Sequence, residues 1–281
     1  MNTSSVPILL ATNGAPASLP ALRYGAWLAD ELNSPVKLLG IQESGPWRHM
    51  LASALEGTQA ELQEQGRTFE VISMHGNSEE RIAEYAERGE TGLLVFGPFG
   101  RPGWRRWLRG RSIRRIMQRV SSPFIYVRQA PMQLRRILVC LGGLGYSFPM
   151  LEIAIYLASA TGAEMSLLHI IEPGAYEYPT ARRAHAKVGD LLDSDTPQGR
   201  NLQAALEATS RAGIDSEILI RSGYTLEEIS KVAASGRYDL LGLGSPYSSQ
   251  SLRHLATTNI TAQIAELVPV PVLVARKQAE R

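Results

Sequence analysis

The chain has 281 residues, of which 44% are hydrophobic and 20% are charged, and its formal net charge is +2. This composition excludes disordered, collagen-like and coiled-coil proteins, and the length suits two domains better than one small core. A single cysteine, Cys140, excludes an intramolecular disulfide framework. Because the first residues lack a basic signal segment and no apolar run approaches the roughly 20 residues of a membrane span, we expect a cytoplasmic protein without a membrane span.

In chain order, short apolar runs alternate with helical patterns, and the whole series occurs twice. The first strand, Ile-Leu-Leu-Ala-Thr, stops at a glycine-containing turn, and a helical pattern follows it before the next strand. The predicted strands of the first series are 7–12, 36–41, 69–73, 92–97 and 123–127. Those of the second series are 136–141, 165–170, 216–221, 238–243 and 271–275.

The repeat predicts an α/β fold with two doubly wound domains, each built on a five-stranded parallel sheet with helices on both faces. The predicted domains are residues 1–130 and 131–281, and a short proline-containing linker joins them at 128–133. The second copy carries extra residues around 173–198, between its second and third strands. We interpret this segment as a surface insertion, which is either tolerated or functional.

In open parallel sheets, ligands bind beyond the carboxyl ends of the strands, so the turn after the fourth strand is a candidate site. That turn contains Gly97 and Gly100, and a third glycine, Gly110, follows after nine residues. Glycine allows a backbone to approach an anion closely, and the helix predicted to start near Ser112 would direct its positive end toward a phosphate. Arg111 and Ser112 could donate to the same anion.

The strand pattern and the spacing of these three glycines resemble the universal stress protein family of the ATP-binding type. The resemblance covers about 6–128 and 134–276 and implies a tandem pair of Rossmann-like domains of the adenine nucleotide alpha hydrolase type. It also implies that ATP or AMP binds in the first domain. Asn13 stands where the family has an acidic residue and Arg111 stands where its motif has Ser or Thr, so magnesium is not expected to assist binding.

The family's adenine contact is made by backbone near the end of the second strand. The resemblance therefore assigns the nucleotide site of the first domain to eight residues. They are Asn13, Gly14, Ile41, Gly97, Gly100, Gly110, Arg111 and Ser112.

The second domain departs further from the family pattern. Tyr247 replaces the second glycine of the turn, Thr258 and Asn259 replace the last Gly-Ser pair, and Gly142 replaces the acid. Side chains at positions of close approach should obstruct a phosphate. We expect this second site to be empty or to hold another small ligand, with Ile170 at the position that corresponds to Ile41.

Residues 101–119 contain eight arginines and no acidic residue, so the positive charge of the chain is concentrated there. The segment could be a phosphate-binding loop, or it could dock an acidic protein partner or an anionic part of the same molecule. Nucleic acid is the least favoured partner, because Trp104 and Trp107 suit core or interface packing better than base stacking.

No pattern typical of catalysis is present. The five histidines lack metal-ligand spacing, and Cys140 lies in an apolar strand that suits a core position. We therefore predict a stress-response protein with a regulatory role and at most weak ATP hydrolysis. The alternative is an adaptor that binds no nucleotide and acts through its arginine-rich surface. The resemblance also implies that strands 124–127 and 272–275 pair the two domains, and that whole chains associate as homo-oligomers.

Overall fold

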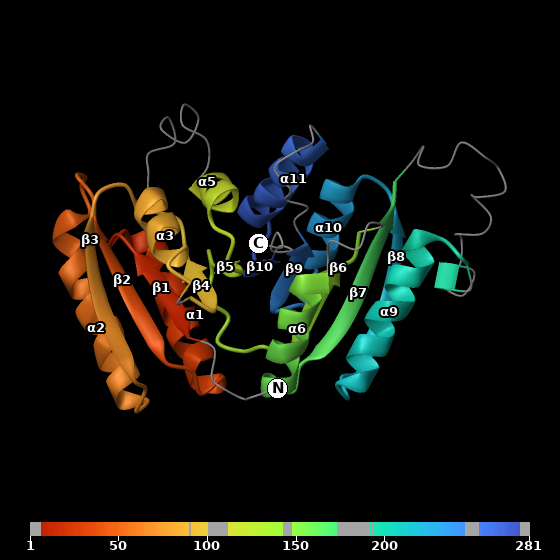
Figure 1. The fold of residues 1–281 in the computed structure, drawn as a ribbon, viewed down its shortest axis with the longest axis horizontal. Coiled ribbons are helices and arrows are strands. Elements are labelled where there is room, and N and C mark those ends of the chain that lie inside the picture. The colour runs from red at the N-terminus through yellow and green to blue at the C-terminus, as the bar shows by residue number, and fades with distance from the viewer. Residues whose placement is uncertain are drawn as a thin grey trace. The chain divides into compact units, whose positions relative to one another are not determined.

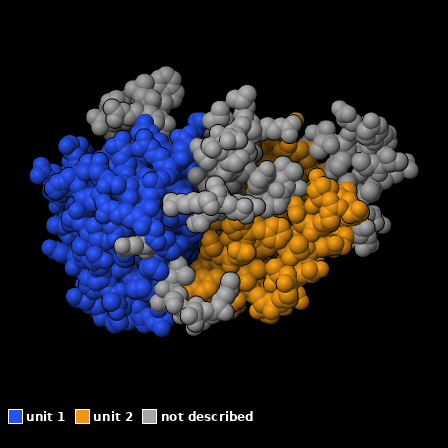
Figure 2. Space-filling view, viewed as in Figure 1, with its two compact units in different colours: residues 1–132 blue, residues 133–281 orange. Residues whose placement is uncertain are grey.

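The computed structural model describes residues 7–89, 91–100, 112–142, 148–172, 191–192, 194–244 and 253–275; the side chains of residues 112 and 253–259 lie outside the description. The chain forms two compact units, Met1–Met132 and Gln133–Arg281 (Figure 2). Each unit is an α/β domain with a parallel sheet, so the predicted fold class is confirmed.

The first unit alternates strands and helices along the chain (Figure 1). Its strands are β1 (Ile8–Thr12), β2 (Val36–Gln42), β3 (Phe69–His75), β4 (Leu93–Phe96) and β5 (Phe124–Tyr126). Its helices are η1 (Pro16–Ser18), α1 (Leu19–Glu31), η2 (Arg48–Met50), α2 (Leu51–Glu64), α3 (Ser78–Ala86) and α5 (Ser112–Arg119).

The strands of the first unit lie in the order β3-β2-β1-β4-β5, and all neighbouring pairs are parallel. The chain moves outward from β1 to β3, then crosses back to β4 on the other side of β1. Since such crossovers are right-handed, the reversal places α1 and α2 on one face and α3 and α5 on the other. In agreement, α1 contacts α2 and α3 contacts α5.

The second unit repeats this plan. Its strands are β6 (Arg136–Cys140), β7 (Glu164–Ile171), β8 (Ser216–Ser222), β9 (Leu240–Gly244) and β10 (Val272–Ala275), in the spatial order β10-β9-β6-β7-β8 with all described pairs parallel. Its helices are α6 (Phe148–Thr161), α9 (Pro197–Arg211), α10 (Thr225–Ala233) and α11 (Arg253–Leu267).

All ten predicted strands form, with ends within two residues of the predicted ones. The central strands β1 and β4 are buried at every position because helices cover both faces of each sheet, which explains their continuous apolar runs. Edge strand β3 instead contains only half-buried and exposed positions. The fold thus places the carboxyl ends of the buried central strands together at one edge of each sheet.

Local signals fix several helix ends. The Asn77 side chain accepts a hydrogen bond from the backbone N–H of Glu80 (3.2 Å) and caps α3. Thr196 caps α9 in the same way through the N–H of Gly199 (3.1 Å). Most of the predicted insertion, 173–190 together with residue 193, lies outside the described residues. Within the described part of the chain, no helix is both long enough and apolar enough to cross a membrane.

Candidate functional site

The candidate site of the first unit lies where β1, β2 and β4 end. β1 is hydrogen-bonded to β2 on one side and to β4 on the other, so the three carboxyl ends are neighbours. The order of the strands reverses at this point, and such a switch point is where open α/β sheets bind ligands. Two of the predicted residues, Asn13 and Gly97, directly follow the ends of β1 and β4, and Gly100 lies in the turn after β4.

Asn13 connects the three strand ends. Its side chain is 3% exposed, and its amide nitrogen donates to Glu43 Oε2 (2.9 Å) and to the carbonyl oxygen of Phe99 (3.2 Å). Its Oδ1 accepts from the N–H of Ala15 (3.1 Å). Glu43 follows β2 and Phe99 lies in the turn after β4. The carboxamide of Asn13 therefore joins the loops after β1, β2 and β4 through hydrogen bonds.

Glu43 is a functional candidate that the sequence analysis missed. Its Oε1 accepts a hydrogen bond from the backbone N–H of Ser78 (2.7 Å), the first residue of α3. A carboxylate at a helix N-terminus is stabilised by the helix dipole and by the N–H groups that lack intrahelical partners. The hydroxyl of Ser78 is completely buried and has no hydrogen-bond partner within the described part of the chain.

The glycine turn after β4 is shaped by packing within the protein. A Cβ at Gly97 would lie 2.9 Å from the carbonyl oxygen of Val127, and Gly100 has φ +62°. A Cβ at Gly100 would lie 2.6 Å from Trp47 Nε1, and this indole donates to the Gly100 carbonyl (3.2 Å). The spacing of Gly97 and Gly100 predicted close approach of a phosphate. In the structure, neighbouring protein groups also require glycine at both positions.

The remaining predicted residues are placed as follows. Gly14 has φ +79°, and its Cα lies so close to the start of α2 that a Cβ would be 2.6 Å from Leu51 Cα. Ile41 is fully buried in β2 and pairs with Met74 of β3. Ser112 begins α5, although its side chain is outside the description, and Gly110 and Arg111 lie outside the described residues.

The second unit repeats part of this arrangement. Glu172 follows β7, and its Oε1 accepts from both the N–H (3.3 Å) and the hydroxyl of Thr225, the first residue of α10. Gly142 takes the place of Asn13 and therefore offers no side chain to the glutamate. Half-buried Ile170 lies in β7 as predicted, whereas the predicted obstruction by Tyr247 lies outside the described residues, as do the side chains of residues 258 and 259.

Only the C-terminal part of the arginine-rich segment is described, in α5. Arg114 and Arg115 are half-buried, and neither forms an ion pair within the described part of the chain. Arg119 lies 3.8 Å from Glu80 of α3, and both side chains are about half exposed. Such an exposed contact contributes little stability, so α5 presents a basic surface.

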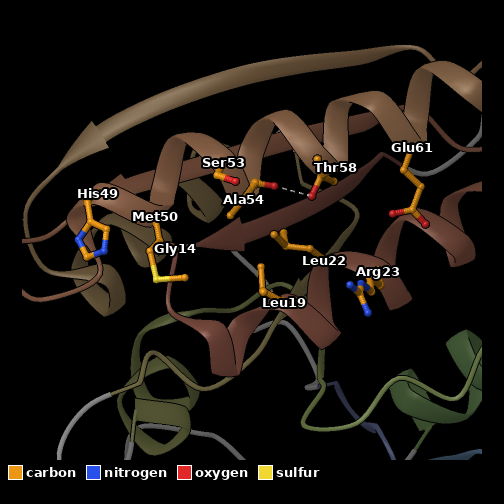
Figure 3. Close-up of a pocket in the computed structure, with 11 residues that line it drawn as sticks. Gly14, Leu19, Leu22, Arg23, His49, Met50, Ser53, Ala54, Thr58 and Glu61 are labelled. Atoms are coloured by element: carbon orange, nitrogen blue, oxygen red, sulfur yellow. Dashed lines mark hydrogen bonds between the residues drawn. The ribbon is translucent and has the colours of Figure 1, made fainter.

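A cavity of about 510 Å³ opens between α1 and α2 (Figure 3). Its lining consists of Gly14, Leu19, Leu22, Arg23, His49, Met50, Ser53, Ala54, Gly57, Thr58 and Glu61. Gly14 is also a predicted site residue and follows Asn13, so this groove between α1 and α2 borders the strand-end site. Burial raises the pKa of Glu61 above its ordinary value of 4.5, while nearby Arg23 opposes the shift and Glu64 adds to it.

The described residues contain no cluster of His, Cys, Asp and Glu side chains that could hold a metal ion. Cys140 is 9% exposed, and burial raises the pKa of its thiol well above the ordinary range. A thiol that stays protonated in an apolar strand is a poor nucleophile, which agrees with the predicted core role.

The fold and the strand-end site define a tandem α/β protein whose two units share one plan. The model of the universal stress protein family matches twice, over residues 6–128 and 133–276. The chain therefore belongs to the universal stress protein family.

Relatives of known sequence or structure cover one or both units. A universal stress protein of Methanocaldococcus jannaschii (MJ0531) is 23% identical over an alignment of 138 residues, which covers 43% of this chain and 81% of that protein. The crystal structure of a universal stress protein from Archaeoglobus fulgidus has a TM-score of 0.71 at 17% identity, with 99% of both chains covered. A Pseudomonas aeruginosa protein of unknown function has a TM-score of 0.64 at 15% identity, with 97% of this chain and 93% of that chain covered. At these identities the solved structures establish the shared fold alone.

Proposed function

We propose that the first unit binds an adenine nucleotide, ATP or AMP, and that occupancy of the site regulates which protein partner the chain meets. The observation that carries this proposal is the side chain of Asn13, which links the ends of β1, β2 and β4 through Glu43 and Phe99. Membership in the universal stress protein family supports the same function.

The residues at the strand ends suit the three parts of a nucleotide. The backbone near Ile41 faces the adenine, the polar side chains of Asn13 and Glu43 suit the sugar hydroxyls, and the turn from Gly97 to Gly100 with the start of α5 suits the phosphates. The buried hydroxyl of Ser78, which lacks a partner among the described residues, is a further polar group that a ligand could satisfy. Because Asn13 is an amide and binds no cation strongly, we expect equal affinity with and without magnesium.

Trp47 provides a direct reporter of occupancy. Its indole lies against Gly100 and donates to the Gly100 carbonyl (3.2 Å), so phosphates that approach this face must displace it. Trp27 is a matched control, because it lies in α1 with its ring centroid 5.4 Å from that of Tyr24.

The test combines calorimetry and tryptophan fluorescence with ATP, ADP and AMP, each with and without magnesium. We expect binding heat in every variant and a change in emission in the wild type and in Trp27→Phe. In Trp47→Phe we expect the heat and a smaller change in emission, since Trp104 and Trp107 lie in the arginine-rich segment and can also respond to phosphate. Absence of both heat and thermal shift at about 1 mM nucleotide would contradict nucleotide binding, since such an affinity corresponds to only about 4 kcal/mol.

The second candidate function is an adaptor that acts through the arginine-rich surface without nucleotide. The observation that favours it is α5, where Arg114 and Arg115 form no ion pair within the described part of the chain. A negative calorimetric result together with loss of an acidic protein partner in Arg114→Glu would select this function. Sedimentation of the intact protein tests the accompanying expectation that whole chains associate.

A further inference from the structure

A glutamate after the second strand binds the N-terminus of the helix that follows the third strand in both units. Glu43 accepts from the N–H of Ser78 (2.7 Å), and Glu172 accepts from the N–H of Thr225 (3.3 Å). The turns between these partners also match, since Gly76 and Gly223 both have positive φ and both donate to the last residue of the second strand. This shared arrangement is a property of the fold.

The two glutamates differ in their other contacts. In the second unit, the hydroxyl of Thr225 donates to Glu172, so the helix start and the carboxylate satisfy each other. In the first unit, Asn13 donates to Glu43 Oε2, and the buried hydroxyl of Ser78 has no partner within the described residues. The first unit therefore gathers a carboxylate, a carboxamide and an unsatisfied hydroxyl at the strand ends.

This set of groups suits a ligand that carries hydroxyls. A carboxylate repels phosphate but accepts strong hydrogen bonds from O–H donors, and its two oxygens offer about four acceptor positions. The Ser78 hydroxyl can donate to, or accept from, a second hydroxyl next to the first. A ribose presents two neighbouring hydroxyls of this kind, and an acidic side chain near the end of the second strand commonly binds them in dinucleotide-binding folds.

We propose that Glu43 determines the specificity of the first unit for ribose over deoxyribose. This assignment rests on the proposed nucleotide function. Asn13 acts as a positioning residue, because its amide holds the Glu43 carboxylate toward the end of β1 (2.9 Å). The acidic group that is missing from the end of β1 is thus supplied from the end of β2, and the phosphates point away from it toward the Gly97–Gly100 turn.

The test measures the affinity ratio between ATP and 2′,3′-dideoxy-ATP by calorimetry with the full chain. Since hydrogen bonds to a charged group are worth about tenfold to hundredfold in affinity, we expect the wild type to prefer ATP by that factor. In Glu43→Gln the ratio should fall below about threefold. Glu172→Gln is the matched control, because it neutralises the corresponding carboxylate of the second unit and should leave the ratio unchanged.

The outcomes separate the two proposals. If the wild type binds no adenine nucleotide, the proposed function is wrong and this assignment is wrong with it. If the wild type binds ATP and the dideoxy analogue equally, nucleotide binding stands and the role of Glu43 is wrong; this comparison needs no variant to fold. Discrimination that persists in folded Glu43→Gln, or that is lost equally in Glu172→Gln, would also overturn the assignment.

Discussion

The two units share a glycine turn and a glutamate bound to a helix N-terminus, and they differ in the side chains around this glutamate. In both units a glutamate after the second strand binds the N-terminus of the helix after the third strand, and a glycine with positive φ, Gly76 or Gly223, precedes that helix. Only the first unit adds Asn13 at the neighbouring strand end, where the second has Gly142. The turn and the glutamate, which both units share, therefore stabilise the fold. The residue at the end of the first strand differs between the units and can vary with the ligand.

The largest expected effect comes from Gly100→Tyr, which copies Tyr247 of the second unit. The residue has φ +62°, and even a Cβ would lie 2.6 Å from Trp47 Nε1 and 2.8 Å from Ala15 Cβ. We expect a loss of about 3 kcal/mol or more in the free energy of unfolding, together with loss of nucleotide binding. Urea unfolding and calorimetry measure the two losses separately.

A double-mutant cycle with Trp47→Ala provides the control for this effect. If the Trp47 indole clashes with a Cβ at position 100, the double variant Gly100→Ala/Trp47→Ala should regain about 1 kcal/mol of the free energy of unfolding that Gly100→Ala loses. The part of the loss that comes from the positive φ should remain. Strictly additive losses would show that Trp47 does not pack on Gly100.

The sequence predicted the strands well because each one is a short apolar run buried under helices on both faces. It also predicted which strand ends lie side by side, since parallel strands all end at one edge of the sheet and the glycine turn marks one of them. The signal for Gly100 was ambiguous, however, because a glycine beside a bulky indole and a glycine beside a phosphate look identical in sequence. Trp47 comes from the irregular segment 43–47 between β2 and η2, whose path no periodicity describes.

The next largest effect should follow from exchanging the residue after the first strand. Asn13→Gly removes hydrogen bonds to Glu43 and to the Phe99 carbonyl in a buried position, and should lower the free energy of unfolding by about 2 kcal/mol. For the reverse change, Gly142→Asn, no described residue lies within 4 Å of the added Cβ, and stability should change by less than about 0.5 kcal/mol. A loss of stability in Asn13→Gly that equals the gain in Gly142→Asn would contradict this difference between the ends of β1 and β6.

Glu43 could have been found from the sequence by one comparison. Glu43 and Glu172 stand at the same place after the second strand of each repeat, and Ser78 and Thr225 begin the matching helices. A polar pair retained in two diverged copies indicates a contact. The bond between Asn13 and Glu43 could not be predicted in this way, because it exists in one copy and joins strands that pair only in the folded sheet.

A smaller gain in stability is expected in the groove between α1 and α2. Gly66 and Gly213 follow α2 and α9 and both have positive φ, so they are equivalent positions of the two units. By the same alignment, Ala204 of the second unit corresponds to Gly57 of the first. A Cβ at Gly57 would have no neighbour within 4 Å among the residues that the structure describes, so Gly57→Ala should raise the free energy of unfolding by about 0.5 to 1 kcal/mol through helix propensity. Thermal unfolding measures the gain, and Ala204→Gly should produce the matching loss.

The smallest effect concerns the charge of Glu61 in the same groove, where the second unit has Ala208 at the corresponding position. Burial raises the folded pKa of Glu61 above the unfolded value, so its ionisation favours the unfolded chain, and stability is lost as the pH rises through the folded pKa. Glu61→Gln should therefore be more stable than the wild type at pH 7 by about 0.5 kcal/mol or less, with the difference vanishing near pH 3. The exposed neighbour provides the control, because Glu64→Gln removes a like charge from Glu61 and should shift its titration downward without abolishing it. A wild type that gains stability from pH 4 to pH 7 relative to Glu61→Gln would mean that attraction to Arg23 outweighs burial in this groove.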